Sequence, residues 1–473
     1  MQLSSEFVPT VTMPEVDVES LLIEDESAPK DEPFRFGYSM PVTLSLTNSG
    51  YWQDLPDGAR LWRLNLQVPG ALTVNLLYSR YFVPEGGKLF IYNADYEMVL
   101  GAFTSFNNKE HGEFSTAPVA GDLITVEYYE PAGAAGLSQI SISDVIHGYR
   151  DFFGLSDRNY GDSGACNNNV MCPVGEPWTD DIRSSAMIIL SGGTRLCSGA
   201  LVNNVRQDFS QDFLTANHCL TGSVNSWIIL FNYQSPGCNN QNGSVADYVQ
   251  GTTLRAANSH SDFALLELNE EIPPEYNVYY SGWSAIDTPP ETPVGIHHPS
   301  GDIKKITFDY DYGISSGWNN NDGSHWRIAN WEDGTTEGGS SGSPIYNSEH
   351  RIVGQLHGGQ ASCQNNINDY YGKIARSWDY GTSASNRLRD WLDPDNTGAL
   401  VLDGIDPNLI YTLGDVNDDS ELNVLDVVLI VNIILHQIEP TYVQTLSADL
   451  NEDGVVNVLD VIGLINIIVN NGN

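Results

Sequence analysis

The sequence predicts a mainly β protein with a small α-helical module at its C-terminal end. Short strand patterns, such as the alternation of apolar and polar residues at 61–68, recur between residues 33 and 405. Turn signals rich in Gly and Pro, such as Pro84–Gly87, separate them. Two apolar helix patterns occur within residues 413–470, and the only clear helix signal of residues 161–405 is at 383–392. Because 473 residues exceed what one hydrophobic core usually holds, we expect several domains.

The N-terminal third divides into two parts. Residues 1–32 are acidic and aperiodic, so we expect a disordered arm or the remnant of a leader. Within them, Met1–Ser20 lack the basic and apolar regions of a signal peptide. Residues 33–153 are expected to form a β-sandwich, either a pro-region or an accessory domain, with strand patterns at 61–68, 73–78, 88–92 and 123–129.

The charge and the cysteine content limit the classes of function that the chain can have. The chain has 61 acidic and 21 basic residues, a formal charge of −40, which repels phosphates and argues against a nucleic acid partner. The same charge attracts calcium and basic peptides. No apolar run is long enough for a transmembrane segment. Six cysteines, all in the middle of the chain, suggest three disulfides and a secreted or extracellular protein, with fifteen pairings open.

Residues 161–405 carry many strand patterns and three catalytic motifs, which fits a double β-barrel. His218 ends the apolar strand of Phe213–Cys219, a position suited to proton transfer. Asp262 opens the apolar strand 261–268 and can orient a histidine. Ser341 lies in the Gly-rich turn Gly338–Pro344, whose tight backbone can direct N–H groups inward.

The order His218, Asp262, Ser341 matches chymotrypsin-like serine proteases and differs from the order in subtilisins and α/β-hydrolases. We therefore expect His218 as the general base, Asp262 as its orienting carboxylate and Ser341 as the nucleophile. The backbone N–H groups of Gly339 and Ser341 would form the oxyanion hole. Such a reaction needs no cofactor. The alternative is a non-catalytic binding protein built on a protease scaffold.

Several segments of this region resemble the bacterial lysyl endopeptidases, a family of trypsin-like serine proteases. They include Cys197–Asn204, the His218 motif, Ser261–Leu268, Gly295–Pro299, Gly339–Tyr346, Gly354–Gly359 and Trp391–Pro394. The resemblance implies a secreted endopeptidase that acts on protein or peptide substrates. It also implies three disulfides, Cys166–Cys363, Cys172–Cys238 and Cys197–Cys219.

The resemblance further suggests how a lysine side chain would be recognised. Thr335, six residues before Ser341 where trypsins carry an acid, is neutral. The family's Asp-x-Tyr-Gly pattern instead matches Asp369, which would meet the lysine ammonium in the S1 pocket. His357 and Trp318 lie at positions that the family uses near its active site. A protease with another P1 preference remains the alternative.

Residues 413–470 contain two acidic loops with the spacing of EF-hand calcium ligands, each leading into an apolar helix with no preceding helix evident. This repeat resembles a type I dockerin, which implies a cohesin domain as partner. Ser420 replaces the usual glycine of the first loop. The expected ligands are Asp415, Asn417, Asp419, Glu421, Asn423 and Asp426 in the first loop, and Asp449, Asn451, Asp453, Val455, Asn457 and Asp460 in the second.

Overall fold

The structure is a computed structural model of the chain. It describes residues 8–29, 32–150, 163–409, 411–435, 437–438, 440, 442–451 and 453–471. The expected start of the middle domain at residue 161, the end of the expected sandwich at 151–153 and residues 1–7 and 30–31 of the expected arm lie outside the described residues.

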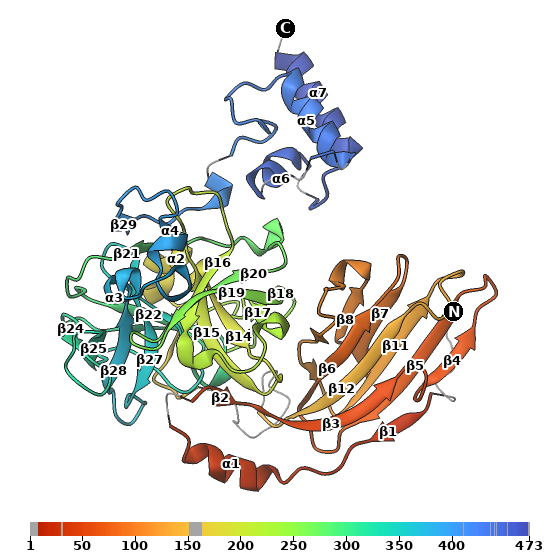
Figure 1. Cartoon of the computed structure of the whole chain (residues 1–473), viewed down its shortest axis with the longest axis horizontal. Helices are drawn as coiled ribbons and strands as arrows, with labels where there is room; N and C mark the ends of the chain where they lie inside the picture. The colour runs from red at the N-terminus through yellow and green to blue at the C-terminus, as the bar shows by residue number, and fades with distance from the viewer. Residues whose placement is uncertain are drawn as a thin grey trace.

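The first part of the chain forms two facing sheets, antiparallel except for the pairing of β1 with β5, as expected for a sandwich (Figure 1). We call it the N-terminal module. One sheet has the order β1–β5–β11–β7–β8, with β4 beside β5: Thr10–Thr12, Arg60–Gln67, Leu123–Glu130, Lys88–Asn93, Val99–Phe103 and Tyr51–Asp54. The other has the order β10–β6–β12–β3, with β9 beside β6: Val119–Ala120, Thr73–Phe82, Gln139–Gly148, Gly37–Ser45 and Phe114–Ser115.

The strand patterns read from the sequence correspond to real strands. The patterns at 61–68, 73–78, 88–92 and 123–129 fall on β5, β6, β7 and β11. In β11 the burial alternates residue by residue, because successive side chains of a strand point to opposite faces. Strand β5 is buried along most of its length, with Trp62, Leu64 and Leu66 all fully buried.

The expectation of a disordered arm is wrong for the described residues 10–12 and 18–26. Strand β1 pairs in parallel with β5, and residues Val18–Glu26 form helix α1. Asp17 caps the helix by accepting a hydrogen bond from the Ser20 amide at 3.1 Å. Asp25 receives hydrogen bonds from Arg35 at 2.8 Å and from Arg150 at 2.7 Å. These long-range pairs order an acidic segment that has little apolar periodicity of its own.

The middle module contains a ten-stranded and an eight-stranded sheet, the two-barrel arrangement of the chymotrypsin-like class. The first comprises β13, β23, β22, β26, β27, β28, β25, β24, β21 and β29: Asn168–Asn169, Lys305–Phe308, Val294–His297, Pro344–Tyr346, Arg351–Gly359, Ile367–Lys373, His325–Asn330, Ile314–Ser316, Gly282–Ser284 and Val401–Leu402. The second comprises β18, β17, β14, β15, β16, β20 and β19, joined by β2: Tyr248–Gln250, Ile228–Leu230, Ser185–Ile189, Arg195–Leu201, Asp212–Ala216, Phe263–Leu268, Thr252–Asn258 and Phe34–Arg35.

Short helices and disulfides complete the middle module. The helices are α2, α3 and α4: Thr179–Ser184, Ile374–Asp379 and Arg389–Leu392. All three disulfide pairings that the family resemblance implies are confirmed: Cys166–Cys363, Cys172–Cys238 and Cys197–Cys219. The structure describes no free cysteine.

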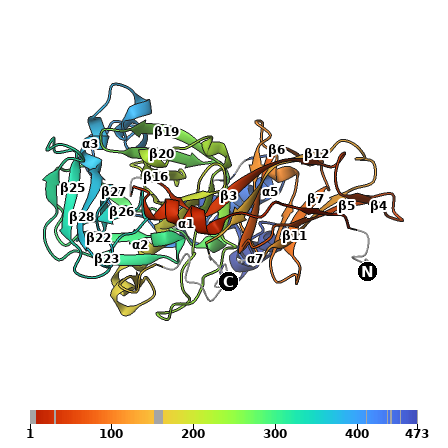
Figure 2. The ribbon, with the colours of Figure 1, turned by 90° about the horizontal axis from the view of Figure 1, so that it is seen from below.

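The N-terminal and middle modules are joined by a common core. Met187, Leu196 and Leu230 of the eight-stranded sheet belong to the same buried apolar cluster as the sandwich side chains. Across the junction, Ser115 Oγ donates to the Ser226 carbonyl at 2.7 Å. Strand β2 extends the middle sheet by pairing with β15, and α1 crosses the underside of the junction (Figure 2). Sequence periodicity within either module contains no sign of this junction.

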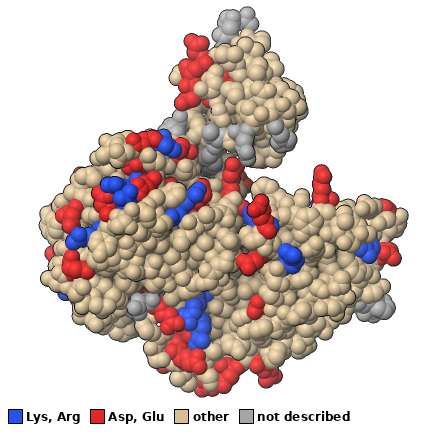
Figure 3. Space-filling model, in the orientation of Figure 1, with Lys and Arg blue, Asp and Glu red and all other residues tan. Residues whose placement is uncertain are grey.

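The described residues of the C-terminal module form three α-helices, α5, α6 and α7: Val424–Ile434, Tyr442–Ala448 and Val458–Asn471. Helix α6 precedes the second acidic loop, so the expectation that no helix precedes either loop is wrong for that loop. Figure 3 shows acidic side chains along one side of this module and scattered over the rest of the visible face. Among the described residues, no helix combines the length and apolarity that crossing a bilayer requires.

The common core generates a stability prediction. Replacing Leu196, which is fully buried, by Ala should lower the free energy of unfolding by about 2–5 kcal/mol, because a cavity opens between both modules. Urea denaturation followed by tryptophan fluorescence measures this. Leu254→Ala, at a site 44% exposed, is the control and should change stability by less than about 0.5 kcal/mol. Two separate transitions in the wild type, with Leu196→Ala moving only one, would contradict the common core.

Candidate active site

His218 lies in a short turn of 3-10 helix, Asn217–Cys219, which directly follows strand β16. The Cys197–Cys219 disulfide ties this turn to β15. The ring Nδ1 atom lies 2.7 Å from Asp262 Oδ2, and the backbone amide of His218 donates to Asp262 Oδ1 at 2.9 Å. The carboxylate therefore holds both the ring and the backbone of the histidine. Among the described residues, the other ring nitrogen, Nε2, has no hydrogen-bond partner.

Asp262 adopts a backbone conformation that is unusual for its residue type. Its φ of 54° lies in the left-handed region, and only 2% of the residue is exposed. Its carbonyl accepts a hydrogen bond from the Asn217 amide at 2.8 Å, next to His218. Such strain persists where the surroundings determine the conformation fully, which is common at functional sites.

Ser341 and Gly339 lie in a turn between β25 and β26 that contacts β15 of the eight-stranded sheet. The Ser198 amide donates to the Ser341 carbonyl at 2.7 Å, which brings the turn beside the Cys197–Cys219 bridge. Gly339 has a φ of 92°, and a Cβ there would lie 2.8 Å from the His298 carbonyl oxygen, so only glycine fits. The amides of Gly339 and Ser341 donate no hydrogen bond to any described residue. They are therefore free to receive an oxyanion.

His357 and Trp318 extend the site beyond these residues. The His357 ring stacks on Trp318 at a centroid distance of 4.0 Å and lies parallel to the His218 ring at 5.6 Å. Its Nδ1 atom lies 3.0 Å from His325 Nε2. Burial lowers the pKa of His357 to about 4, so the ring is neutral near pH 7. A row of flat side chains therefore leads from His218 to Trp318.

Asp369 is completely buried on strand β28, beside the strand that carries His357. Its Oδ2 atom accepts hydrogen bonds from Trp331 Nε1, at 2.8 Å, and from Thr336 Oγ1. The Ala361 amide donates to Oδ1 at 3.3 Å. These three donors are neutral, and they orient the carboxylate.

Sequence reasoning missed three residues that hold this site together. His325 contacts His357, while Trp331 and Thr336 bind Asp369. All three come from the segment between β24 and the Ser341 turn, which contains no catalytic motif. The only signal in the sequence is the position of Thr336 five residues before Ser341.

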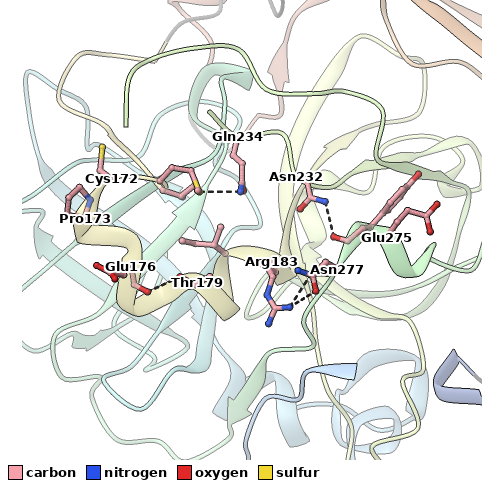
Figure 4. A pocket seen from close by; sticks show the side chains of 13 residues that line it. Cys172, Pro173, Glu176, Thr179, Arg183, Asn232, Gln234, Glu275 and Asn277 are labelled. Atoms are coloured by element: carbon pink, nitrogen blue, oxygen red, sulfur yellow. Dashed lines mark hydrogen bonds between the residues drawn. The ribbon is translucent and has the colours of Figure 1, made fainter. Parts of the chain in front are cut away.

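A separate hollow lies on the middle module away from the residues of the candidate site. It has a volume of about 540 Å³, and no residue of the predicted triad lines it (Figure 4). Its polar side chains mostly bind one another: Arg183 donates to the Asn277 side chain at 2.9 Å, and Asn232 donates to the Tyr276 carbonyl at 2.9 Å. Groups satisfied in this way show no chemistry aimed at a ligand.

The two acidic loops of the C-terminal module have closely similar internal hydrogen bonds. In the first, the Asn423 amide donates to Asp426 Oδ2 at 2.9 Å; in the second, the Asn457 amide donates to Asp460 Oδ2 at 2.8 Å. Ser420 has a φ of 67°, where the second loop has Gly454 with a φ of 80°. The side-chain oxygens of both loops suit calcium, although Ser420 bears backbone strain that Gly454 avoids.

The two-barrel fold is that of the chymotrypsin-like serine proteases, and the contact between His218 and Asp262 fits the triad expected from the sequence. Residues 160–372 match the family model "Lysyl endopeptidase, C-terminal domain", and residues 413–469 match "Dockerin type I domain". The chain thus contains a lysyl endopeptidase-like serine protease domain preceded by a β-sandwich region and followed by a type I dockerin.

Three individual proteins are similar to parts of the chain. The chain is 28% identical over 364 residues to the lysyl endopeptidase of Pseudomonas aeruginosa, covering 68% of this chain and 74% of that protein. Among solved structures, the protease Anisep of Arthrobacter nicotinovorans matches 44% of this chain and 93% of its own, with 18% identity and a TM-score of 0.32. The thermostable serine protease AL20 from an extremophilic microorganism matches 41% of this chain and 92% of its own, with 13% identity and a TM-score of 0.32.

The lowered pKa of His357 generates a prediction about pH. The folded protein protonates the His357 ring only near pH 4, whereas an unfolded histidine is protonated near pH 6.5. The neutral ring therefore contributes its full share of the free energy of unfolding above pH 6.5, and this contribution is lost as pH falls towards 4. His357→Gln should therefore reduce the slope of unfolding free energy against pH by up to about 1.4 kcal/mol per pH unit in this window. Urea denaturation between pH 4.5 and 6.5 measures the slope. The exposed His111→Gln variant should keep the wild-type slope.

Proposed function

We propose that the protein is an extracellular serine endopeptidase that cleaves peptide bonds on the C-terminal side of lysine and binds a cohesin-bearing partner through its dockerin. The main support is that the Asp262 carboxylate contacts both the ring and the backbone amide of His218. The nearby serine turn contains two backbone amides, those of Gly339 and Ser341, that donate to no described residue. The three disulfides are consistent with an oxidising, extracellular location.

The proposed mechanism follows from these positions. Ser341 Oγ attacks the carbonyl carbon of the scissile bond, and His218 Nε2 accepts the serine proton. Asp262 keeps the proton of the imidazole on Nδ1 and stabilises the imidazolium. The amides of Gly339 and Ser341 donate to the oxyanion. His218 then protonates the leaving amine, and water hydrolyses the acyl-enzyme by the same steps.

The preference for lysine would reside in Asp369. This buried carboxylate is held by Trp331 and Thr336, so it is oriented before a substrate arrives. A lysine ammonium that reaches it would form a desolvated ion pair, which a neutral side chain could not replace. The stacked rings of His357 and Trp318 would line the neighbouring substrate surface.

Peptide mapping of a denatured protein tests both assignments. Wild type should cut after Lys; Ser341→Ala should lower kcat roughly a millionfold because the nucleophile is lost. Asp369→Asn should lower kcat/KM for a Lys substrate by about 100-fold or more because the ammonium loses its partner. Asp369→Asn should still react with a phosphonylating reagent, which shows that the triad is intact. Asp379→Asn, 57% exposed, is the carboxylate control and should resemble wild type.

The other outcomes separate the alternatives. Cuts at other residues that disappear in Ser341→Ala would retain the protease and overturn the role of Asp369. Absence of cleavage and of labelling in the wild type would favour a binding protein on a protease scaffold.

Calcium and the partner are assigned to the C-terminal module. The ligand sets read from the sequence, from Asp415 to Asp426 and from Asp449 to Asp460, would hold one calcium ion per loop. Bound calcium would neutralise the clustered carboxylates. Beyond each loop, the helix begins with exposed apolar residues: Val424 and Leu425 are 66% and 57% exposed, and Val458 and Leu459 are 61% and 57% exposed. Two equal apolar pairs would offer a cohesin two related binding poses.

The duplicated pairs generate a binding prediction. Changing Val424 and Leu425 to Asp should weaken binding to a type I cohesin only about twofold, because the second pose remains. Changing all four residues should weaken it more than about 100-fold. Titration calorimetry against a panel of type I cohesins, with and without EDTA, measures both effects. A complete loss of binding with the first pair alone would contradict the two-pose model.

A further inference from the structure

Three carboxylates meet at one end of the ten-stranded sheet, away from the triad. Asp309 follows strand β23, Asp311 lies two residues further on, and Glu332 lies just beyond strand β25. One carboxylate oxygen from each residue lies within 4.8 Å of the other two. The three side chains come from segments that are distant in sequence, so this is not a simple acidic run.

Backbone hydrogen bonds hold the two segments together. The Phe308 amide donates to the Asp333 carbonyl at 2.8 Å, and the Glu332 amide donates to the Phe308 carbonyl at 3.1 Å. The Asp309 amide donates to the Pro293 carbonyl at 3.0 Å. The carboxylates are therefore brought together by the fold of the sheet, whether or not a ligand is bound.

Asp309 is the unusual member of the group, because only 1% of it is exposed. Its Oδ1 atom accepts a hydrogen bond from the Asp311 amide at 2.9 Å. Its Oδ2 atom is buried and has no hydrogen-bond partner among the described residues. Glu332 accepts hydrogen bonds from the Tyr310 amide at 2.8 Å and from Asn330 at 3.3 Å.

No described Lys, Arg or His forms an ion pair with any of these carboxylates. A buried carboxylate oxygen without a donor is costly, and two further carboxylates nearby increase the repulsion. A cation bound by the three groups would remove both costs. Hard carboxylate oxygens from a preformed loop, with room for water at the two exposed residues, are the ligands that calcium prefers.

We propose that Asp309, Asp311 and Glu332 bind a calcium ion. The site is separate from the dockerin loops and lies in the middle module. The competing explanation is that Asp309 and Glu332 share a proton, which would need no metal.

The position of the site gives the ion a second effect. Glu332 follows Trp331, whose indole donates to Asp369, and Thr336 of the same segment also donates to Asp369. A cation that joins Glu332 to the end of β23 would fix the segment that carries both donors. This part of the proposal depends on the proposed role of Asp369 in binding lysine.

Calcium stoichiometry of the full-length chain tests the site directly. Equilibrium dialysis at saturating calcium should show about three ions per wild-type chain, two of them in the dockerin. Asp309→Asn and Glu332→Gln should each bind one ion fewer, because each removes a charged ligand. Glu291→Gln, an acidic residue that accepts from Tyr312 in the neighbouring loop, is the control and should keep the wild-type number.

Tryptophan fluorescence separates this site from the dockerin. All ten tryptophans lie between residues 52 and 391, so their signal reports no unfolding of the dockerin itself. Calcium should raise the Tm of wild type and of the dockerin variant Asp415→Ala/Asp449→Ala by several degrees. Calcium should not raise the Tm of the variant that combines Asp309→Asn with Asp415→Ala/Asp449→Ala.

The results have clear meanings. Equal calcium stoichiometry in wild type and Asp309→Asn would overturn the proposal. A Tm of the dockerin variant that does not change with calcium would also overturn it. Both results would favour a proton shared by Asp309 and Glu332. A calcium-dependent Tm together with cleavage that shows no preference for lysine would retain the ion site and overturn only the role of Asp369. If the link to Asp369 holds, EGTA should raise KM for a Lys substrate in wild type and leave it unchanged in Asp309→Asn.

Discussion

The pairing of Asp262 with His218 is the constraint around which the middle module is arranged. One carboxylate binds both the ring and the backbone amide of the histidine, at 2.7 and 2.9 Å. This requires Asp262 to adopt a left-handed backbone immediately before β20, while a disulfide holds Cys219, next to His218, to β15. Strain at the aspartate is offset by hydrogen bonds and burial, so the end of β16 and the start of β20 have little freedom to shift against each other.

Most of the site could be predicted because local sequence encodes it. A histidine at a strand end, an aspartate that opens an apolar strand and a serine among glycines are each visible within a few residues. The loop ligands of the dockerin are visible for the same reason, since an EF-hand-like loop is a local structure. Pairing of the cysteines needed the family resemblance, because Cys166 and Cys363 are separated by 197 positions in the sequence and nothing local indicates their contact.

The remaining features depend on contacts between distant segments. Helix α1 is stabilised by Arg35 and Arg150, which meet Asp25 from other parts of the chain, and its own sequence has weak apolar periodicity. His325 and Trp331 read as ordinary strand residues until β25, β27 and β28 bring them to His357 and Asp369. The Asp309 cluster is likewise formed by two loops that are joined by hydrogen bonds of the Phe308 backbone and the Tyr310 amide.

The common core between the sandwich and the middle module changes what a cut between them would achieve. Hydrolysis of one peptide bond in the connection would leave the apolar side chains around Leu196 still packed against the sandwich, and β2 still paired with β15. Severing the chain and parting the two halves are therefore different events with different energies. A nicked molecule would migrate as two bands in a denaturing gel and as a single particle in size-exclusion chromatography.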